Sequence, residues 1–208
     1  MTKLYVAQGA CSFGAHVVAR EITLASGLPI EIIKVPLRTP DSPIHKVNPL
    51  GRVPTVVTDS GEVITENGAI LPWLADLNPA AGLSAPLGST ERAQIQEWIG
   101  FLNSDIHGAY KPVNRPNLFH ADEEVQKGIR EQGIARLREL VRVIQRKLEG
   151  KTWAVGERFT AADAYLGVFL RWLPRAGIDI AEFPGLAAWL ERFNARESVK
   201  AAVAFEAA

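Results

Sequence analysis

The pattern of hydrophobic and polar positions over residues 1–78 switches repeatedly between extended and helical periods. An apolar run at 3–7 predicts a strand, and residues 14–26 repeat apolar side chains near helical spacing. Gly27 stops this helix, and the branched apolar run at 30–35 predicts a buried strand. The three segments together predict a βαβ crossover unit.

The second part of this region predicts a hairpin and another helix. Four prolines in residues 36–49 indicate an irregular segment with at most one helical turn. Strands are expected at 55–58 and 62–65, on either side of a tight loop that ends in a glycine, followed by a helix at 67–77. The βαβ and ββα units predict an α/β layer with a mixed sheet.

The remainder of the chain predicts helices only. Residues 79–88 are rich in proline, glycine, alanine and serine and are interpreted as a linker between a first domain, 1–78, and a second, 89–208. Two apolar stripes at helical spacing run through the second domain: Ile95, Trp98, Ile99, Leu102 and Ile106, and Ile134, Leu137, Leu140, Val141, Ile144 and Leu148. The fold class is therefore α/β plus all-α, with a C-terminal helical bundle.

Composition narrows the class of protein. Among 208 residues, Lys plus Arg and Asp plus Glu both number 23, so no global charge attracts nucleic acid or an anionic membrane surface. The sequence contains no segment that reads as a signal peptide or membrane helix. A single cysteine cannot form a disulfide within the chain, which predicts a reducing, cytoplasmic location.

That cysteine, Cys11, is the first candidate for chemistry. It lies where the first strand gives way to the first helix, beside free backbone N–H groups and the positive end of the helix dipole, which stabilise a thiolate or a bound anion. The alternative is that Cys11 is a small buried hydrophobic residue. The four histidines are dispersed without ligand spacing, so we expect no metal.

Four short motifs follow one another along the chain. They are Gly9–Ser12 at the Cys11 turn, Asn48–Pro54 with the pattern N-P-x-G-x-V-P, Thr65–Ile70, and Phe159–Tyr165 with the pattern F-T-x-A-D. In this order they resemble motifs of the glutathione transferase superfamily: Gly9–Ser12 resembles the active-site turn of its bacterial beta class, and Thr65–Ile70 stands in place of a T-E-S-x-A-I run. The resemblance covers nearly the whole chain and implies a thioredoxin-like first domain.

The resemblance also implies that glutathione is a co-substrate and that Cys11 and Ser12 face its sulfur. Arg52, Val53 and Pro54 would then form the segment that pairs with the glutathione backbone like an added strand. A cis bond before Pro54 would turn the Val53 peptide groups toward that ligand, and the resemblance predicts this isomer.

Two other groups of residues complete the expected site. Glu66 and Asn67 precede a helix, where free N–H groups and the Asn67 amide can hold a carboxylate while Glu66 contacts an amine. The alternative is that Asn67 caps the helix. His107 stands where beta-class enzymes carry a histidine near the thiol, within a polar stripe that includes Asn103 and Ser104. The alternative for His107 is a half-buried packing residue.

Thr160 and Asp163 have the spacing of a reciprocal helix cap, and we interpret them as structural. The predicted function is transfer of the glutathione thiol to a small electrophile, with a role in detoxification, in a homodimer. Two alternatives are a glutathione-dependent, one-thiol disulfide reductase that forms a mixed disulfide on Cys11, and a non-catalytic glutathione-binding protein.

Overall fold

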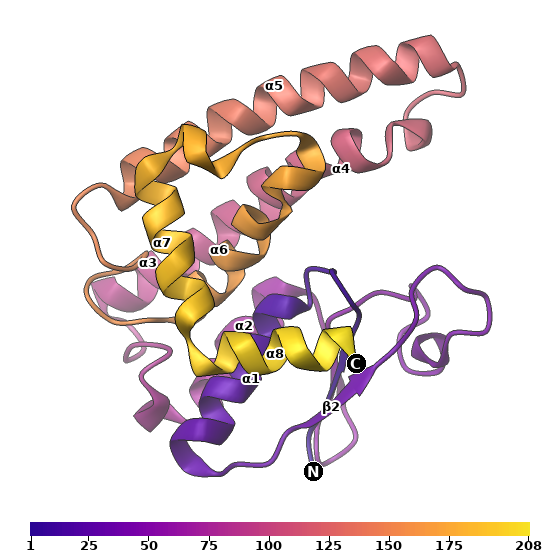
Figure 1. Ribbon diagram of the computed structural model, residues 1–208. Coiled ribbons are helices and arrows are strands. Elements are labelled where there is room, and N and C mark those ends of the chain that lie inside the picture. Colours follow the sequence, from indigo (N-terminus) through magenta and orange to yellow (C-terminus); the bar gives the residue numbers. More distant parts are fainter.

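The computed structural model describes residues 1–208 and places a four-stranded sheet beside a bundle of helices (Figure 1). The strand order is β2-β1-β3-β4, in which β1 is parallel to β2 and antiparallel to β3, and β4 is antiparallel to β3. The strands are β1 (Lys3–Val6), β2 (Glu31–Lys34), β3 (Thr55–Val57) and β4 (Val63–Thr65). The mixed sheet is confirmed, with strands one or two residues shorter than predicted.

The two faces of the sheet are covered differently. Leu4 of β1 pairs with Val56 of β3, and both are fully buried beneath α1 (Phe13–Ser26) and α2 (Asn67–Leu77). The opposite face carries a small apolar cluster that includes Val53 and Ile44. Ile44 comes from the single turn η1 (Pro43–Lys46), so the proline-rich segment is irregular, as predicted, and serves to cover the sheet.

The second half of the chain is helical throughout. It contains α3 (Thr90–Phe101), the π-helical turn η3 (Leu102–Ile106), α4 (His107–Asn114), α5 (Glu123–Leu148), α6 (Ala161–Trp172), α7 (Pro184–Ala195) and α8 (Glu197–Ala207). A short 3-10 turn, η2 (Pro79–Ala81), precedes α3, and three more lie between the later helices: η4 (Pro116–Leu118), η5 (Leu173–Ala176) and η6 (Ile180–Glu182). None of these helices combines the length and the hydropathy needed to cross a bilayer.

One apolar core joins the two halves. A cluster of 48 buried residues runs from β1 and α1 into α6 and α7, and α6 is buried over most of its length. Figure 1 shows α8, the yellow helix, returning from the bundle to cross α1, with the C-terminus beside the sheet. The last helix therefore packs on the first half of the chain, and the division at residues 78 and 89 stays a prediction.

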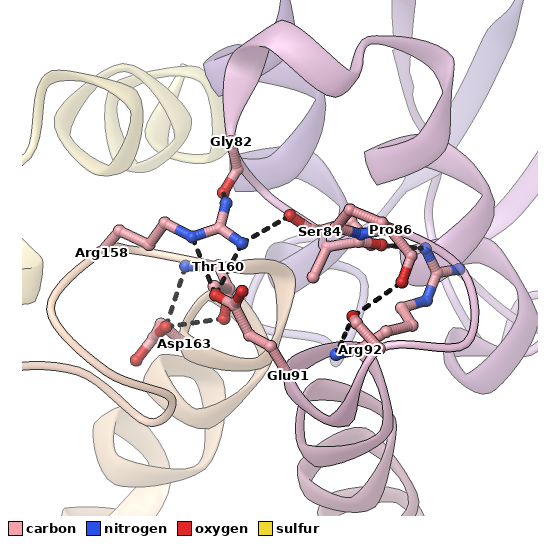
Figure 2. Close-up of polar contacts among 10 residues, drawn as sticks. Gly82, Ser84, Pro86, Glu91, Arg92, Arg158, Thr160 and Asp163 are labelled. Carbon is pink, nitrogen blue, oxygen red and sulfur yellow. Dashed lines mark hydrogen bonds and ion pairs between the residues drawn. The ribbon is translucent and has the colours of Figure 1, made fainter.

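Two arginines fasten the segment between α2 and α3 (Figure 2). Arg158 donates to the carbonyl oxygens of Gly82 and Ser84 and to the Glu91 carboxylate. Arg92 binds both oxygens of Asp76, at 2.6 and 2.7 Å, and the Ser84 hydroxyl at 2.6 Å. A loop without regular structure leaves its carbonyl groups without hydrogen-bond partners, and these two arginines supply the missing donors. The segment between α2 and α3 is therefore fixed in place by hydrogen bonds.

The predicted cap at the start of α6 forms. The Asp163 carboxylate accepts the Thr160 N–H at 2.9 Å and the Thr160 hydroxyl at 2.9 Å, within a capping box. Its other oxygen accepts the Ala154 N–H at 2.7 Å. The motif thus ties the loop before α6 to the helix, and the structural interpretation of these residues is confirmed.

Candidate active site

The turn between β1 and α1 presents Cys11 beside the loop that precedes β3. Hydrogen bonds from Ala10 N–H to the Ala7 carbonyl and from Phe13 N–H to the Ala10 carbonyl, both 3.2 Å, form the turn. Cys11 is partly buried, and its Sγ donates to the Val53 carbonyl oxygen at 3.3 Å. The thiol and the motif around Val53 are therefore in contact, as the resemblance implies.

Ser12 occupies a different place from Cys11. Its side chain is fully buried, and its hydroxyl accepts the Ala7 N–H at 3.1 Å. The backbone carbonyl of Ser12 accepts the His16 N–H at 2.9 Å, which begins the hydrogen bonding of α1. Ser12 thus closes the turn from the inside, and the role of its side chain against a ligand sulfur stays a prediction.

The electrostatics of Cys11 correct an expectation drawn from the helix dipole. Burial raises the pKa of the thiol from 9.0 to about 11, and the negative charge of Glu66 adds to the rise. The N–H groups of Cys11 and Ser12 and the Asn67 amide act in the opposite direction, but they do not offset desolvation. The expectation of a stabilised thiolate on Cys11 is wrong for this state, because removing the group from water outweighs the aligned N–H groups.

The loop before β3 is held by Asn48, which sequence reasoning did not place in the site. Its amide donates to the Arg52 carbonyl at 3.2 Å and to the Thr55 hydroxyl at 3.0 Å, and its oxygen accepts the Leu50 N–H at 3.0 Å. Side-chain bonds of this kind fix a loop that has no strand partner. Asn48 opens the N-P-x-G-x-V-P motif, so the signal was present in the sequence.

The loop before β3 carries a main-chain donor without a hydrogen-bond partner next to the thiol. The Val53–Pro54 peptide bond is cis, as predicted from the resemblance. Pro54 has no N–H, and the Val53 N–H donates no hydrogen bond within the chain. The Arg52 side chain is exposed. Beside Cys11, the chain therefore presents an unpaired backbone donor and the Val53 carbonyl, which are the groups that an added extended peptide would bind.

The junction of β4 and α2 lies against the same turn. Glu66 has a φ of 70°, which is rare for a side chain other than glycine, and its exposed side chain makes no ion pair. Asn67 is buried and donates from its amide to the Cys11 carbonyl at 3.4 Å. The alternative that Asn67 caps α2 is wrong, because Glu66 occupies the cap position and Asn67 reaches across to the Cys11 turn.

A π-helical turn changes the polar stripe expected around His107. The His107 N–H bonds the Leu102 carbonyl, five residues back, so one extra residue enters the helix between α3 and α4. Ser104 becomes exposed and bonds the Gly100 carbonyl at 3.0 Å and the Asp105 carboxylate at 2.7 Å. Asn103 instead accepts the Tyr165 hydroxyl at 3.0 Å. Asn103 thus faces the core side of the helix, and Ser104 faces solvent.

His107 lies against aromatic rings. Its ring is 5.6 Å from the ring of Phe169 and 5.8 Å from that of Trp172, centroid to centroid. Burial lowers the pKa of His107 below 6.5; Glu66 raises it and Arg52 lowers it, which places both charges near the ring. The imidazole is therefore neutral near pH 7, with a nitrogen that can accept a proton.

The structure brings most of the predicted residues to one place. The negative charge of Glu66 acts to raise the pKa of Cys11, of His107 and of Tyr165, which places all three near this carboxylate. Burial is the main cause of the raised pKa of Tyr165. Tyr165 is a member that sequence reasoning missed: it is fully buried in α6 and reaches Asn103. Its position in the F-T-x-A-D motif pointed only to a helix cap, and nothing in the local pattern indicated that it would reach the site.

Comparisons with known proteins agree with this geometry. The family model "Glutathione S-transferase, N-terminal domain" matches residues 19–77, and "Glutathione S-transferase, C-terminal domain" matches residues 114–197. Glutathione S-transferase GST-4.5 of Xanthomonas campestris is 37% identical over 205 residues, which is 98% of each chain. GstA of Escherichia coli O157:H7 is 33% identical over 208 residues, again 98% of each.

Solved structures show the same likeness. A sphingomonad glutathione S-transferase, solved in complex with glutathione, aligns with a TM-score of 0.87 and 34% identity over 99% of this chain and 98% of that one. The beta-class enzyme of Sphingomonas chungbukensis aligns with a TM-score of 0.86 and 34% identity over 98% of both. The chain therefore belongs to the glutathione S-transferase family and is similar to its bacterial beta class.

Proposed function

We propose that this chain transfers the thiol of glutathione to small electrophiles, with the sulfur of glutathione held next to Cys11. The protein is an enzyme of its family, and glutathione is its co-substrate. The observation that carries the assignment of the site is the contact between Cys11 Sγ and the Val53 carbonyl, beside an unpaired Val53 N–H. A thiol next to an unpaired main-chain donor suits a short peptide that itself carries a thiol side chain.

The charged ends of glutathione have separate partners in this proposal. Glu66, exposed and unpaired, binds the α-amine, while the first N–H groups of α2 bind the adjacent carboxylate. Arg52 is the cation that lies near His107 and binds the second carboxylate. Asn67 supports this arrangement by donating a hydrogen bond to the Cys11 carbonyl. Pro54 has no N–H, so it cannot donate a hydrogen bond to a neighbouring strand at the edge that glutathione joins.

The chemistry is a nucleophilic substitution at carbon. The glutathione S–H gives its proton to a base, the sulfur electron pair forms a C–S bond, and a leaving group such as chloride departs with the electrons of the bond that breaks. The neutral His107 imidazole is the side chain that can accept the proton. The neutral Cys11 thiol turns its S–H from the Val53 carbonyl to the sulfur of glutathione, and this hydrogen bond stabilises the glutathione thiolate.

The high pKa of Cys11 favours hydrogen bonding over nucleophilic attack by this residue. A cysteine that forms mixed disulfides reacts as a thiolate, and a pKa of about 11 leaves few thiolates near neutral pH. The reductase hypothesis requires Cys11 Sγ to react as a thiolate, whereas the transferase hypothesis requires it to remain a protonated hydrogen-bond donor. Replacing Cys11 therefore separates the two.

The test begins with binding of glutathione, measured by isothermal titration at neutral pH. We expect saturable binding, and no detectable heat at millimolar ligand would overturn the proposal. Turnover is then measured with 1-chloro-2,4-dinitrobenzene, from which glutathione displaces chloride. Cys11→Ser keeps a hydroxyl donor and should retain more turnover than Cys11→Ala. His107→Gln should lower kcat, whereas His120→Gln, at an exposed histidine, should leave it unchanged.

The state in which the enzyme acts is part of the proposal. We infer a homodimer that works in the cytoplasm, where its single free cysteine stays reduced. Exposed apolar side chains at Leu118, Phe119 and Val125 offer surface for a second copy. Light scattering at micromolar concentration should give twice the mass of one chain, and a monomer would contradict this.

A further inference from the structure

The turn that carries Cys11 is held on both sides of one residue by distant side chains. The Gly9 N–H donates to Glu206 Oε2 at 2.9 Å, and the Gly9 carbonyl accepts from Arg175 Nη1 at 2.9 Å. Glu206 comes from the last turns of α8, and Arg175 from the short turn η5 that follows α6. Glu206 and Arg175 therefore form a clamp on Gly9, which lies two positions before Cys11 in the sequence.

Glycine is favoured at this position, because a positive φ strains most other residues. Gly9 has a φ of +65°, and a Cβ on it would come within 2.6 Å of Arg175 Nη2. Behind the turn lies a cavity of about 80 Å³, lined by residues that include Ala10, Phe13 and Glu206. Because side chains do not fill this space, packing alone does not fix the turn, and the two polar contacts supply the constraint.

Glu206 is an unusual residue to find here, because it is 8% exposed and its Oε1 atom has no hydrogen-bond partner. Burial raises its pKa, while the Gly9 N–H and the charges of Arg171, Arg175 and Lys34 act to keep it ionised. A buried carboxylate is costly unless its bonds are strong. Glu206 takes no part in the proposed binding of glutathione or in the transfer of its thiol.

We propose that Glu206 and Arg175 are positioning residues of the active site: through Gly9 they fix the turn that aims Cys11 at the Val53 carbonyl and at bound glutathione. The link to catalysis rests on the proposed function, whereas the effect on the Cys11 thiol does not depend on it. Through this clamp, α8 couples the end of the chain to the start of α1, across which it lies in Figure 1.

The first measurement follows the thiol itself. Cys11 is the sole cysteine, so intact mass after treatment with iodoacetamide reports its alkylation alone. In Glu206→Ala the turn loosens, the thiol gains water, and its pKa falls from about 11 toward 9.0. We expect the alkylation rate at about pH 8 to rise about fivefold. Glu206→Gln keeps an acceptor for the Gly9 N–H and should stay within about twofold of the unaltered chain.

The second measurement follows catalysis. Glu206→Ala moves a turn that contacts glutathione and carries the Cys11 hydrogen-bond donor, so it should raise KM for glutathione about tenfold and lower kcat as well. Arg175→Ala removes the other half of the clamp from an exposed position and should change alkylation and KM in the same direction. Glu197→Ala, at an exposed glutamate of the same helix, is the matched control and should match the unaltered chain in both.

Circular dichroism and thermal melting establish which variants are folded. Should Glu206→Ala fail to fold, Arg175→Ala and Glu206→Gln decide the matter. Folded clamp variants that lose melting temperature but keep both the alkylation rate and KM would reduce the clamp to a structural contact and overturn the proposal. A Glu206→Gln variant as altered as Glu206→Ala would also overturn it. If the unaltered chain never turns over glutathione, the proposed function fails, and alkylation still decides whether the clamp positions Cys11.

Discussion

Cys11 shows how two electrostatic effects compete at one atom. Backbone N–H groups at the start of α1 favour its thiolate, and removal from water favours its thiol; the second effect is the larger. Position at a helix start is visible in the sequence, whereas the depth of burial depends on Val53 and Asn67, more than forty residues away along the chain. The motif therefore identified the residue but not its charge.

The raised pKa has a direct consequence for reactivity. Below a pKa of about 11, each pH unit should raise the thiolate fraction about tenfold, so the alkylation rate of Cys11 should climb steadily from about pH 7 to about pH 10. Iodoacetamide labelling of the glutathione-free protein, followed by mass spectrometry at several pH values, measures this. A rate that levels off near pH 8 would show that the thiol is more acidic than the structure indicates.

At the scale of elements, the cap of α6 combines strong bonds with deep burial. Burial raises the pKa of Asp163 from 3.8 to about 6, although hydrogen bonds from Ala154, from Thr160 and from its own N–H act to lower it. A carboxyl group whose folded pKa exceeds its unfolded value stabilises the fold most when protonated. The free-energy contribution of this group is therefore largest below about pH 4 and declines as the pH rises through about 6.

Replacing Asp163 should expose both effects. Asp163→Ala leaves the N–H groups of Ala154 and Thr160 without acceptors, so we expect the free energy of unfolding to fall by about 2–4 kcal/mol near pH 7. In Asp163→Asn the loss should be greatest at about pH 4 and smaller at about pH 6, because only the native side chain titrates. Urea unfolding across this pH range measures the difference, and a constant difference would contradict the raised pKa.

The packing of α6 on α7 depends on one glycine. A Cβ at Gly167 would come within 2.2 Å of the Phe193 ring, whereas a Cβ at Gly128 in α5 meets nothing within 4 Å. We expect Gly167→Ala to lower the free energy of unfolding by about 1–3 kcal/mol, because the buried ring has no room to move. Gly128→Ala should instead be neutral or stabilising by up to about 1 kcal/mol, because alanine favours the helix. Denaturant titration of the two variants tests the pair, and equal effects would contradict it.

The π-helical turn at η3 shows why residue spacing did not predict the orientation of every side chain in this helix. Spacings of three and four predicted that Asn103, Ser104 and His107 share one face, and this holds only for a regular α-helix. One inserted residue turned Ser104 to solvent and left Asn103 against Tyr165. The face that a polar stripe presents therefore depends on the hydrogen-bond register of the helix, which the spacing of residues does not show.

At the scale of the whole molecule, the single core predicts unfolding as one unit. The apolar cluster crosses between the halves, and Arg92, with a side chain 7% exposed, bonds Asp76 across the junction of α2 and α3. Fluorescence, which reports mainly on tryptophans of the second half, and far-ultraviolet circular dichroism should therefore give one coincident transition in urea.

Weakening the junction should disturb that behaviour in a defined way. Arg92→Ala leaves the Ser84 hydroxyl and the Ala85 carbonyl without their donor and should lower the urea concentration at the midpoint of unfolding. Arg136→Ala, which removes an exposed pair with Glu139, should change it little. Two separate transitions in the unaltered chain would contradict a shared core.

The sequence by itself determined the order of strands and helices, the α6 cap and the region of the site, because hydrophobic period, turn residues and capping spacings act over a few neighbouring positions. The four motifs also sufficed to indicate the family. The tertiary structure alone decided that the Cys11 thiol is neutral, that Ser104 turns away, that Tyr165 reaches Asn103, and that Glu206 and Arg175 hold Gly9. Burial and long-range hydrogen bonds depend on which distant segments meet, and that is settled only when the whole core packs.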